Sequence, residues 1–270
     1  MTKLLLPVRA CKRVVIAYGF RRDFSSFRNH IHTHLPEISQ IGFDLVVILS
    51  SDNINYELFV NNQARGSFEI NPRFLEFEAL QVALSAVLAD YDTYIYFNCS
   101  LFSKHILSSA RKAIAECLDN VESASCPCLS GRTDYFTIRE YETNIPVLRQ
   151  FISTFFLIFN KSGAELIKNL LDDYPRILNS SKKYDFDELE KSIVYRLSYC
   201  NKNYLNSPES LIFLKAGSVL VEKLISIHMY ECGRLVPAGS LNSNTIRILE
   251  FGKNFIYKRI PCARSYLSRF

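Results

Sequence analysis

The sequence predicts an α/β fold in which a mixed, mostly parallel sheet is flanked by helices and one half resembles a Rossmann-like nucleotide-binding unit. Continuous apolar runs at residues 13–19, 43–49 and 94–97 are typical of strands that are buried on both faces. A helical segment separates the first two runs, and polar residues follow the second and third. This order predicts a right-handed strand–helix–strand crossover with the strand ends on one edge of the sheet.

Length and composition agree with this class of protein. The 270 residues are 48% hydrophobic and 13% aromatic, which is enough to bury the core of a single α/β domain. The net charge is +5, but the 32 basic residues are dispersed along the chain, so nucleic-acid binding is not favoured. A diphosphate ligand or an anionic membrane surface would suit this mild positive charge equally well.

Cysteine usage and hydropathy indicate the compartment. The eight cysteines have irregular spacing for a disulfide framework, which favours free thiols in a reducing environment. Cys126-Pro127-Cys128 is a tight pair that is more typical of a proline turn between two elements than of a metal site. No apolar run approaches the roughly 18 residues of a membrane span. We therefore expect a cytoplasmic protein, with peripheral membrane association as an open alternative.

The third apolar run ends in a polar segment that we interpret as a binding site. Residues 94–97 are followed directly by Asn98, Cys99 and Ser100. In open α/β sheets the carboxyl ends of strands expose backbone amides and short side chains to ligands. Asp92 precedes the same strand and is expected roughly 20 Å from Ser100, because each strand residue advances the chain by about 3.3 Å.

The first two strands are expected to end on the same edge. Tyr18 lies near the end of the first strand, and Ser51 and Asp52 follow the second. Because the carboxyl ends of parallel strands meet at one edge, a ligand held at Asn98 should also contact these residues.

Helical periodicity predicts further elements around the sheet. They cover residues 24–40, a helix that opens at residue 71, residues 103–118 and a helix that is entered from residue 185. In the first, His30 and His34 share a face with i, i+4 spacing. No carboxylate constellation lies near them, so we interpret these two and His32 as a helix surface and not as a metal site.

Two of these helices begin with carboxylates whose roles the sequence leaves open. Glu76 and Glu78 lie in the first turns of the second helix, where the macrodipole favours negative charge, so Glu76 serves either ligand binding or helix stabilisation. Asp187 and Glu190 have the spacing of a capping box, which would make both structural. A catalytic role for Glu190 competes with that interpretation.

Five segments also match, in order and in spacing, the motifs of a known family. They are Asn98-Cys99-Ser100, which follows a Tyr-Asp pair, and the segments at residues 128–134, 152–159, 242–245 and 247–259. These segments resemble the Asn-Asp-Ser strand end, the Gly-Leu-Thr-Asp turn, a long apolar strand, the Asn-Pro-Thr segment and the basic tail of rhamnan synthesis protein F-like glycosyltransferases. The resemblance extends from about residue 13 to residue 260.

The resemblance implies a GT-A-like fold and a nucleotide-sugar-dependent glycosyltransferase. The donor sugar would be a deoxyhexose such as rhamnose, and the acceptor a polysaccharide or a lipid-linked glycan. One GT-A-like domain would cover residues 1–270, with a donor-binding half at 13–125, an acceptor half at 126–260 and a tail at 261–270. Cys99 replaces the family Asp that helps to hold a divalent metal. Because Mg²⁺ and Mn²⁺ prefer oxygen ligands, we expect neither ion to be required and assign no metal ligand.

The candidate site residues follow from both arguments. The donor-binding candidates are Tyr18, Ser51, Asp52, Glu76, Asn98, Ser100, Lys258 and Arg259. Lys258 and Arg259, together with Arg132, would meet the diphosphate charge in place of a metal. Asp134 and Glu190 are the candidates for the carboxylate base that an inverting transfer needs.

A second hypothesis belongs to another class of protein. Loss of the acidic metal ligand at Cys99 would also fit a catalytically inactive GT-A-like domain that binds a sugar nucleotide or a glycan within a polysaccharide-assembly complex. Retention of Asn98, Ser100 and Asp134 favours the enzyme.

Overall fold

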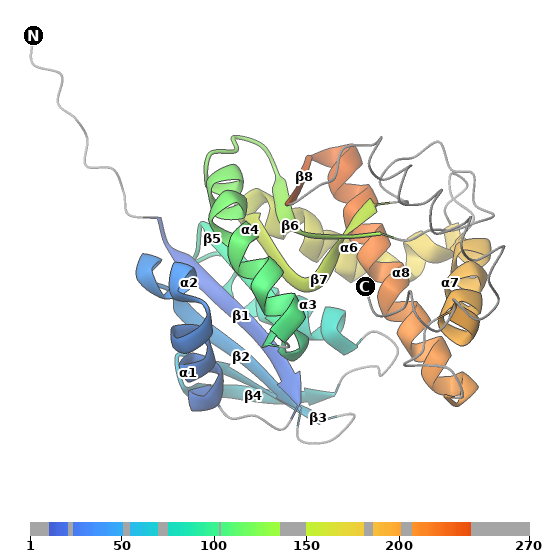
Figure 1. Cartoon of the computed structure of the whole chain (residues 1–270), viewed down its shortest axis with the longest axis horizontal. Helices are drawn as coiled ribbons and strands as arrows, with labels where there is room; N and C mark the ends of the chain where they lie inside the picture. Colours follow the sequence, from blue (N-terminus) through green and yellow to red (C-terminus); the bar gives the residue numbers. More distant parts are fainter. Residues whose placement is uncertain are drawn as a thin grey trace, which may run out of the picture.

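An eight-stranded mixed sheet forms the centre of the molecule (Figure 1). The computed structural model describes residues 11–20, 24–50, 55–69, 75–102, 104–135, 150–180, 186–200 and 207–238. The strands are β1 (Arg13–Phe20), β2 (Asp44–Ser50), β3 (Asn55–Val60), β4 (Gln63–Glu69), β5 (Thr93–Asn98), β6 (Cys128–Tyr135), β7 (Gln150–Asn160) and β8 (Arg234–Ala238). Their spatial order is β4-β3-β2-β1-β5-β7-β6-β8.

The sheet is mixed, as expected, but it is not mostly parallel. β1 pairs in parallel with β2 and β5, and β6 pairs in parallel with β8. The other four neighbouring pairs are antiparallel, so this part of the prediction is wrong. One reason is the β3–β4 hairpin, whose turn residues Asn61 and Asn62 have φ values of 47° and 68°. Two consecutive positive φ values are typical of the tight turns that join antiparallel strands.

Helices cover both faces of the sheet. They are α1 (Phe24–His34), α2 (Pro36–Ile41), α3 (Leu75–Val87), the 3₁₀ helix η1 (Cys99–Phe102), α4 (Lys104–Glu122), α6 (Lys161–Ser180), α7 (Phe186–Cys200) and α8 (Glu209–Cys232). Residues of α1, α2 and α4 form one apolar cluster with the sheet, and residues of α3, α6, α7 and α8 form the other. Alternate residues of β1 enter the two clusters, because successive side chains of a strand point to opposite faces.

The helix predictions hold except at one break. The helix expected over residues 24–40 is two helices, α1 and α2, separated at Leu35. The break follows from Pro36, which has no backbone N–H to donate and stands in the first turn of α2. The predicted inward faces are confirmed, since Phe77, Leu80, Leu84 and Val87 in α3, and Leu189, Ile193 and Leu197 in α7, are all buried.

The segment expected to be a turn at residues 128–134 is instead strand β6. It lies between β7 and β8, which pair with it on its two sides. Gly131 permits this close approach, because a Cβ atom there would lie 2.6 Å from the Phe156 carbonyl oxygen. The glycine therefore serves strand packing and does not mark a turn.

Cys126 and Pro127 lie between α4 and β6, as the interpretation of a proline turn between two elements predicted, and Cys128 is the first residue of β6. Among the described residues, no helix combines the length and hydropathy needed to cross a membrane.

Candidate functional site

The carboxyl ends of β1, β2 and β5 lie side by side. The register places Tyr18 of β1 between Asn98 of β5 and Ile48 of β2, and it pairs Phe20 with Ser50. The prediction that these strand ends share one edge is therefore confirmed for Tyr18, Asn98 and the end of β2. Ser51 and Asp52 lie outside the described residues.

Asn98 and Glu76 meet at this edge. The Asn98 amide nitrogen donates a 2.9 Å hydrogen bond to Glu76 Oε2. Both residues are almost buried, with 8% and 7% of their surface exposed. The Tyr96 hydroxyl donates to the Glu76 carbonyl oxygen at 3.1 Å, which ties the first turn of α3 to β5. Glu76 thus lies at a helix start, as predicted, and its carboxylate also contacts the strand end.

A cation from α8 approaches the same carboxylate. Lys215 Nζ lies 4.0 Å from Glu76 Oε1 in an ion pair whose side chains are 37% and 9% exposed. Lys215 is not among the site residues that the sequence predicts. A signal was present, because Lys215 is a charged residue within the long apolar stretch of α8.

Aromatic side chains lead from the candidate site at β1 toward β3 and β4. The Tyr18 and Tyr56 hydroxyls are 3.3 Å apart, and their rings stack with centroids 6.0 Å apart. Tyr56 in turn stacks on Phe68 of β4 at 6.1 Å. Tyr56 was not predicted as a site residue, because its place beside Tyr18 depends on how the β3–β4 hairpin folds back onto β2.

Beyond Asn98 the chain turns directly into η1, which contains Cys99 and Ser100. Phe102 closes this helix against Phe97 of β5, with ring centroids 5.5 Å apart. The side chains of Cys99 and Ser100 themselves lie outside the description. The backbone of Ser100 lies directly beyond the end of β5, as predicted.

The histidines of α1 do more than form a helix surface. His30 packs edge-on against Phe102 at 5.0 Å, and its Nδ1 lies 2.8 Å from the Ser26 carbonyl oxygen. His34 lies 5.5 Å from His30, whereas His32 is exposed and contacts Ser39 Oγ at 2.6 Å. Within the described ranges, no three His, Cys, Asp or Glu side chains are grouped to hold a metal ion.

The two predicted bases are placed differently. Asp134 lies near the end of β6, where its backbone pairs with Phe151 of β7, but its side chain is not described. Glu190 is a half-buried residue of α7, a helix that packs against α8. The capping-box prediction is wrong as made, because α7 begins at Phe186 and Asp187 lies inside its first turn. Lys258 and Arg259 lie outside the described residues.

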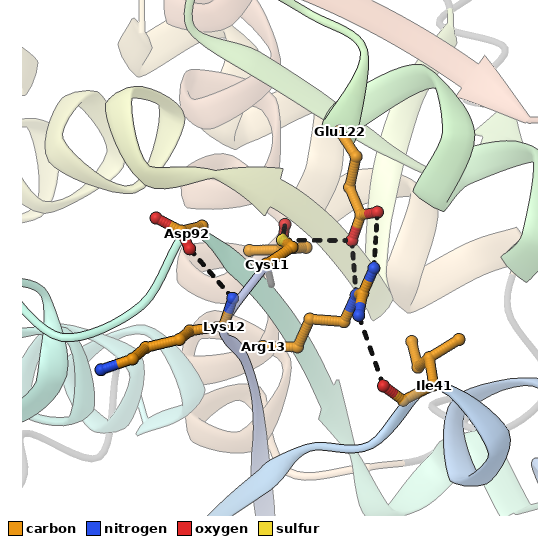
Figure 2. A network of polar contacts seen from close by, with 7 residues as sticks. Cys11, Lys12, Arg13, Ile41, Asp92 and Glu122 are labelled. Carbon is orange, nitrogen blue, oxygen red and sulfur yellow. Dashed lines mark hydrogen bonds and ion pairs between the residues drawn. The ribbon is translucent and has the colours of Figure 1, made fainter. Parts of the chain in front are cut away.

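The amino ends of β1 and β5, opposite the candidate site, carry a different set of polar contacts (Figure 2). Arg13 donates to both carboxylate oxygens of Glu122, at 2.6 and 2.8 Å, and to the Ile41 carbonyl oxygen at 3.3 Å. The hydrogen bond from Arg13 holds the pKa of Glu122 below its usual value. Asp92 Oδ2 accepts from the Lys12 backbone N–H at 2.9 Å, which confirms that Asp92 lies at the far end of β5 from Asn98.

No protein-family model, curated protein or solved structure matches this chain. The structure is that of an α/β protein in which the polar residues Asn98, Glu76 and Lys215 meet at the carboxyl ends of the parallel strands β1, β2 and β5. A carboxylate at such an edge can accept hydrogen bonds from sugar or ribose hydroxyls, and a nearby ammonium can offset phosphate charge.

Proposed function

We propose that this protein is a glycosyltransferase that moves a sugar from a nucleotide-sugar donor to a polysaccharide or lipid-linked glycan acceptor, with inversion at the anomeric carbon. The observation that carries the proposal is the Asn98–Glu76 contact at the carboxyl end of β5, beside Tyr18 of β1. Open α/β sheets bind nucleotide ligands at such an edge. The resemblance of the Asn98-Cys99-Ser100 motif to the family strand end supports the same assignment.

Roles in donor binding follow from position and chemistry. Tyr18 and Asn98 would contact the nucleotide part of the donor, and Glu76 would accept from its hydroxyl groups. Lys215 joins the cations that offset the diphosphate charge, because its ammonium group already lies at this edge. Ser51, Asp52, Ser100, Lys258 and Arg259 remain part of the proposed donor site on the grounds of sequence.

Metal ions have a minor place in this proposal. The position that would hold a metal-binding Asp in the family is Cys99, and a thiol is a poor ligand for Mg²⁺ or Mn²⁺. Protein cations would then take over the stabilisation of the departing diphosphate, which is an electrostatic role that transferases require. We further propose a cytoplasmic location, with peripheral membrane association where the acceptor is lipid-linked.

A second candidate function is a catalytically inactive GT-A-like domain that binds a sugar nucleotide or a glycan within an assembly complex. The identity of Cys99 favours it, since replacement of a metal ligand is a simple route to loss of catalysis. The two candidates share donor binding and differ in turnover.

One experiment separates them. The purified chain is mixed with uridine, guanosine and thymidine diphosphate sugars, and binding is measured by calorimetry while release of nucleoside diphosphate is followed over time. Binding with turnover supports the transferase, and binding without turnover, also in the presence of simple glycosides as acceptors, supports the inactive domain. Absence of binding to every donor would contradict both.

A further inference from the structure

Glu76 is held by two residues of one strand. The Asn98 amide nitrogen donates to its Oε2 atom at 2.9 Å, and the Tyr96 hydroxyl donates to its backbone carbonyl oxygen at 3.1 Å. Tyr96 and Asn98 are two residues apart on β5, so their side chains point to the same face of the sheet. One contact therefore restrains the carboxylate of Glu76, and the other restrains its backbone.

The Tyr96 contact sets the position of the first turn of α3. Glu76 is the second residue of that helix, and Tyr96 is fully buried. A carbonyl oxygen has two lone pairs, so it can accept from the tyrosine and also take part in the hydrogen bonds of the helix. In a dry interior such a bond is directional and electrostatically stronger than in water. The start of α3 is therefore tied to the carboxyl end of β5 and not merely packed against it.

Tyr94 makes comparable contacts at the other end of the helix. Its side chain is buried, and its hydroxyl donates to the carbonyl oxygens of Leu88 and Tyr91, at 2.6 and 3.1 Å. These two residues follow α3, which ends at Val87. Tyr94 and Tyr96 are thus alike in strand, burial and chemistry. They differ in that the partner of Tyr96 belongs to the candidate site.

The position of its carboxylate decides what Glu76 can bind. Groups that bind a ligand have to be held within about 0.5 Å of the productive geometry. A glutamate side chain is flexible, so its carboxylate stays in one place only if the backbone and the carboxylate are both restrained. The contacts from Tyr96 and Asn98 supply these two restraints. A shift of the first turn of α3 would move the carboxylate away from a ligand hydroxyl.

We propose that Tyr96 is a positioning residue of the donor site, which acts through Glu76 and does not touch the donor. This inference rests on the proposed function. The Tyr96 hydroxyl holds the start of α3 so that the Glu76 carboxylate meets a hydroxyl group of the donor. Loss of the tyrosine hydroxyl should therefore weaken donor binding without removing any group that the donor contacts.

The test compares Tyr96→Phe with Tyr94→Phe, because each change removes one buried hydroxyl and keeps the ring. Calorimetry with uridine, guanosine and thymidine diphosphate sugars measures donor affinity, and urea unfolding measures the stability of each variant. Tyr96→Phe should weaken donor binding roughly three- to tenfold, the range expected for the loss of one hydrogen bond. Tyr94→Phe should change donor affinity by less than about twofold, because its contacts lie away from the site. Both variants should unfold at a lower urea concentration than the original protein.

A second comparison shows whether Tyr96 acts through Glu76. Glu76→Ala removes the carboxylate but keeps the backbone carbonyl that Tyr96 contacts. In that variant the further change Tyr96→Phe should alter donor affinity by less than about twofold, because no carboxylate is left to be positioned. A purely structural role of the hydroxyl would give the same loss of affinity with and without the Glu76 side chain.

Other outcomes overturn the inference. Unchanged donor affinity in Tyr96→Phe, an equal loss in Tyr94→Phe, or a Tyr96→Phe protein that fails to fold would show that the hydroxyl serves stability alone. Undiminished donor binding by Glu76→Ala would remove the group through which Tyr96 is inferred to act. If Glu76→Ala binds no donor, the comparison of Tyr96→Phe with Tyr94→Phe decides. If the unmodified protein binds no donor, the proposed function itself is wrong and this inference falls with it.

Discussion

A carboxylate from a neighbouring helix lies at each end of the β1–β5 strand pair. Glu122 of α4 lies at the amino end and Glu76 of α3 at the carboxyl end, and their surroundings differ. At the amino end, Glu122 accepts two hydrogen bonds from Arg13, and the side chains of the pair are 26% and 19% exposed. At the carboxyl end, Glu76 is nearly buried and accepts from the neutral amide of Asn98, with Lys215 at 4.0 Å. The carboxylate at the amino end is therefore partly exposed and paired with Arg13 through two hydrogen bonds, whereas the carboxylate at the other end is nearly buried.

The difference separates a structural contact from a candidate binding site. The Arg13–Glu122 pair fastens the last turn of α4 to β1, and its two hydrogen bonds offset the cost of partial burial. Glu76 is nearly buried, and its carboxylate accepts from the Asn98 amide and lies 4.0 Å from the Lys215 ammonium. This contact lies at the carboxyl ends of parallel strands, where open α/β sheets bind ligands. Four experiments test this contrast.

Removing the Asn98 amide should give the largest effect. Asn98→Ala is expected to weaken donor binding by about 1–3 kcal/mol, or roughly 5- to 150-fold, if its side chain contributes a desolvated polar contact. Asp92→Asn, at the other end of the same strand, is the matched control and should change donor affinity by less than about twofold. Calorimetry with a nucleotide sugar measures both. Equal affinities for the two variants would remove the functional distinction between the strand ends.

Breaking the amino-end pair should affect stability and not binding. Arg13→Gln should lower the free energy of unfolding by about 0.5–1 kcal/mol at neutral pH, since the pair is partly exposed. The pKa of Glu122 is lowered in the folded protein, mainly by the hydrogen bond from Arg13. The stabilisation is therefore complete above the ordinary carboxyl pKa of about 4.3 and is lost as pH falls through the lower folded-state value.

Urea unfolding at pH 7 and at about pH 3 measures this loss. The difference between the original protein and Arg13→Gln should shrink at the acidic pH. A constant difference at both pH values would show that Arg13 stabilises β1 by packing and by its bond to Ile41, and not through the charge of Glu122.

A smaller change is expected from the cation at the carboxyl edge. Lys215→Met should reduce donor affinity by about two- to fivefold, because a partly exposed ammonium is screened by solvent and salt. The variant should also lose part of the salt dependence of donor binding. Lys168→Met is the control, since Lys168 pairs with Asp172 within α6 at 2.6 Å. Tighter donor binding in Lys215→Met would mean that the lysine serves only to neutralise Glu76.

The smallest effect should come from removal of metal ions. EDTA is expected to change donor affinity by less than about twofold, because Cys99 supplies no hard oxygen ligand at the strand end. Cys99→Asp should introduce or strengthen a dependence on Mg²⁺ or Mn²⁺, measured by calorimetry with and without the ion. Loss of donor binding in EDTA by the unmodified protein would show that another carboxylate holds a metal.

Local patterns predicted many elements because they report on the surroundings of their own segment. The apolar run at residues 94–97 is buried on both faces of β5, and the spacing of Phe77, Leu80 and Leu84 gives the inward face of α3. The patterns failed where a residue type has two uses. Gly131 is typical of a turn but here allows β6 to approach β7, and Pro36 divides a helix that periodicity alone would continue.

The sequence by itself determined the α/β class, the buried strands β1, β2, β5 and β7, and the polar end of β5 at Asn98. Only the tertiary structure decided that Glu76 turns toward Asn98 and that Lys215 of α8 joins them. The physical reason is that burial and periodicity are properties of a single helix or strand and leave a local pattern. A contact between elements far apart in the chain depends on how the sheet order and the helix packing bring them together, and no local pattern records that path.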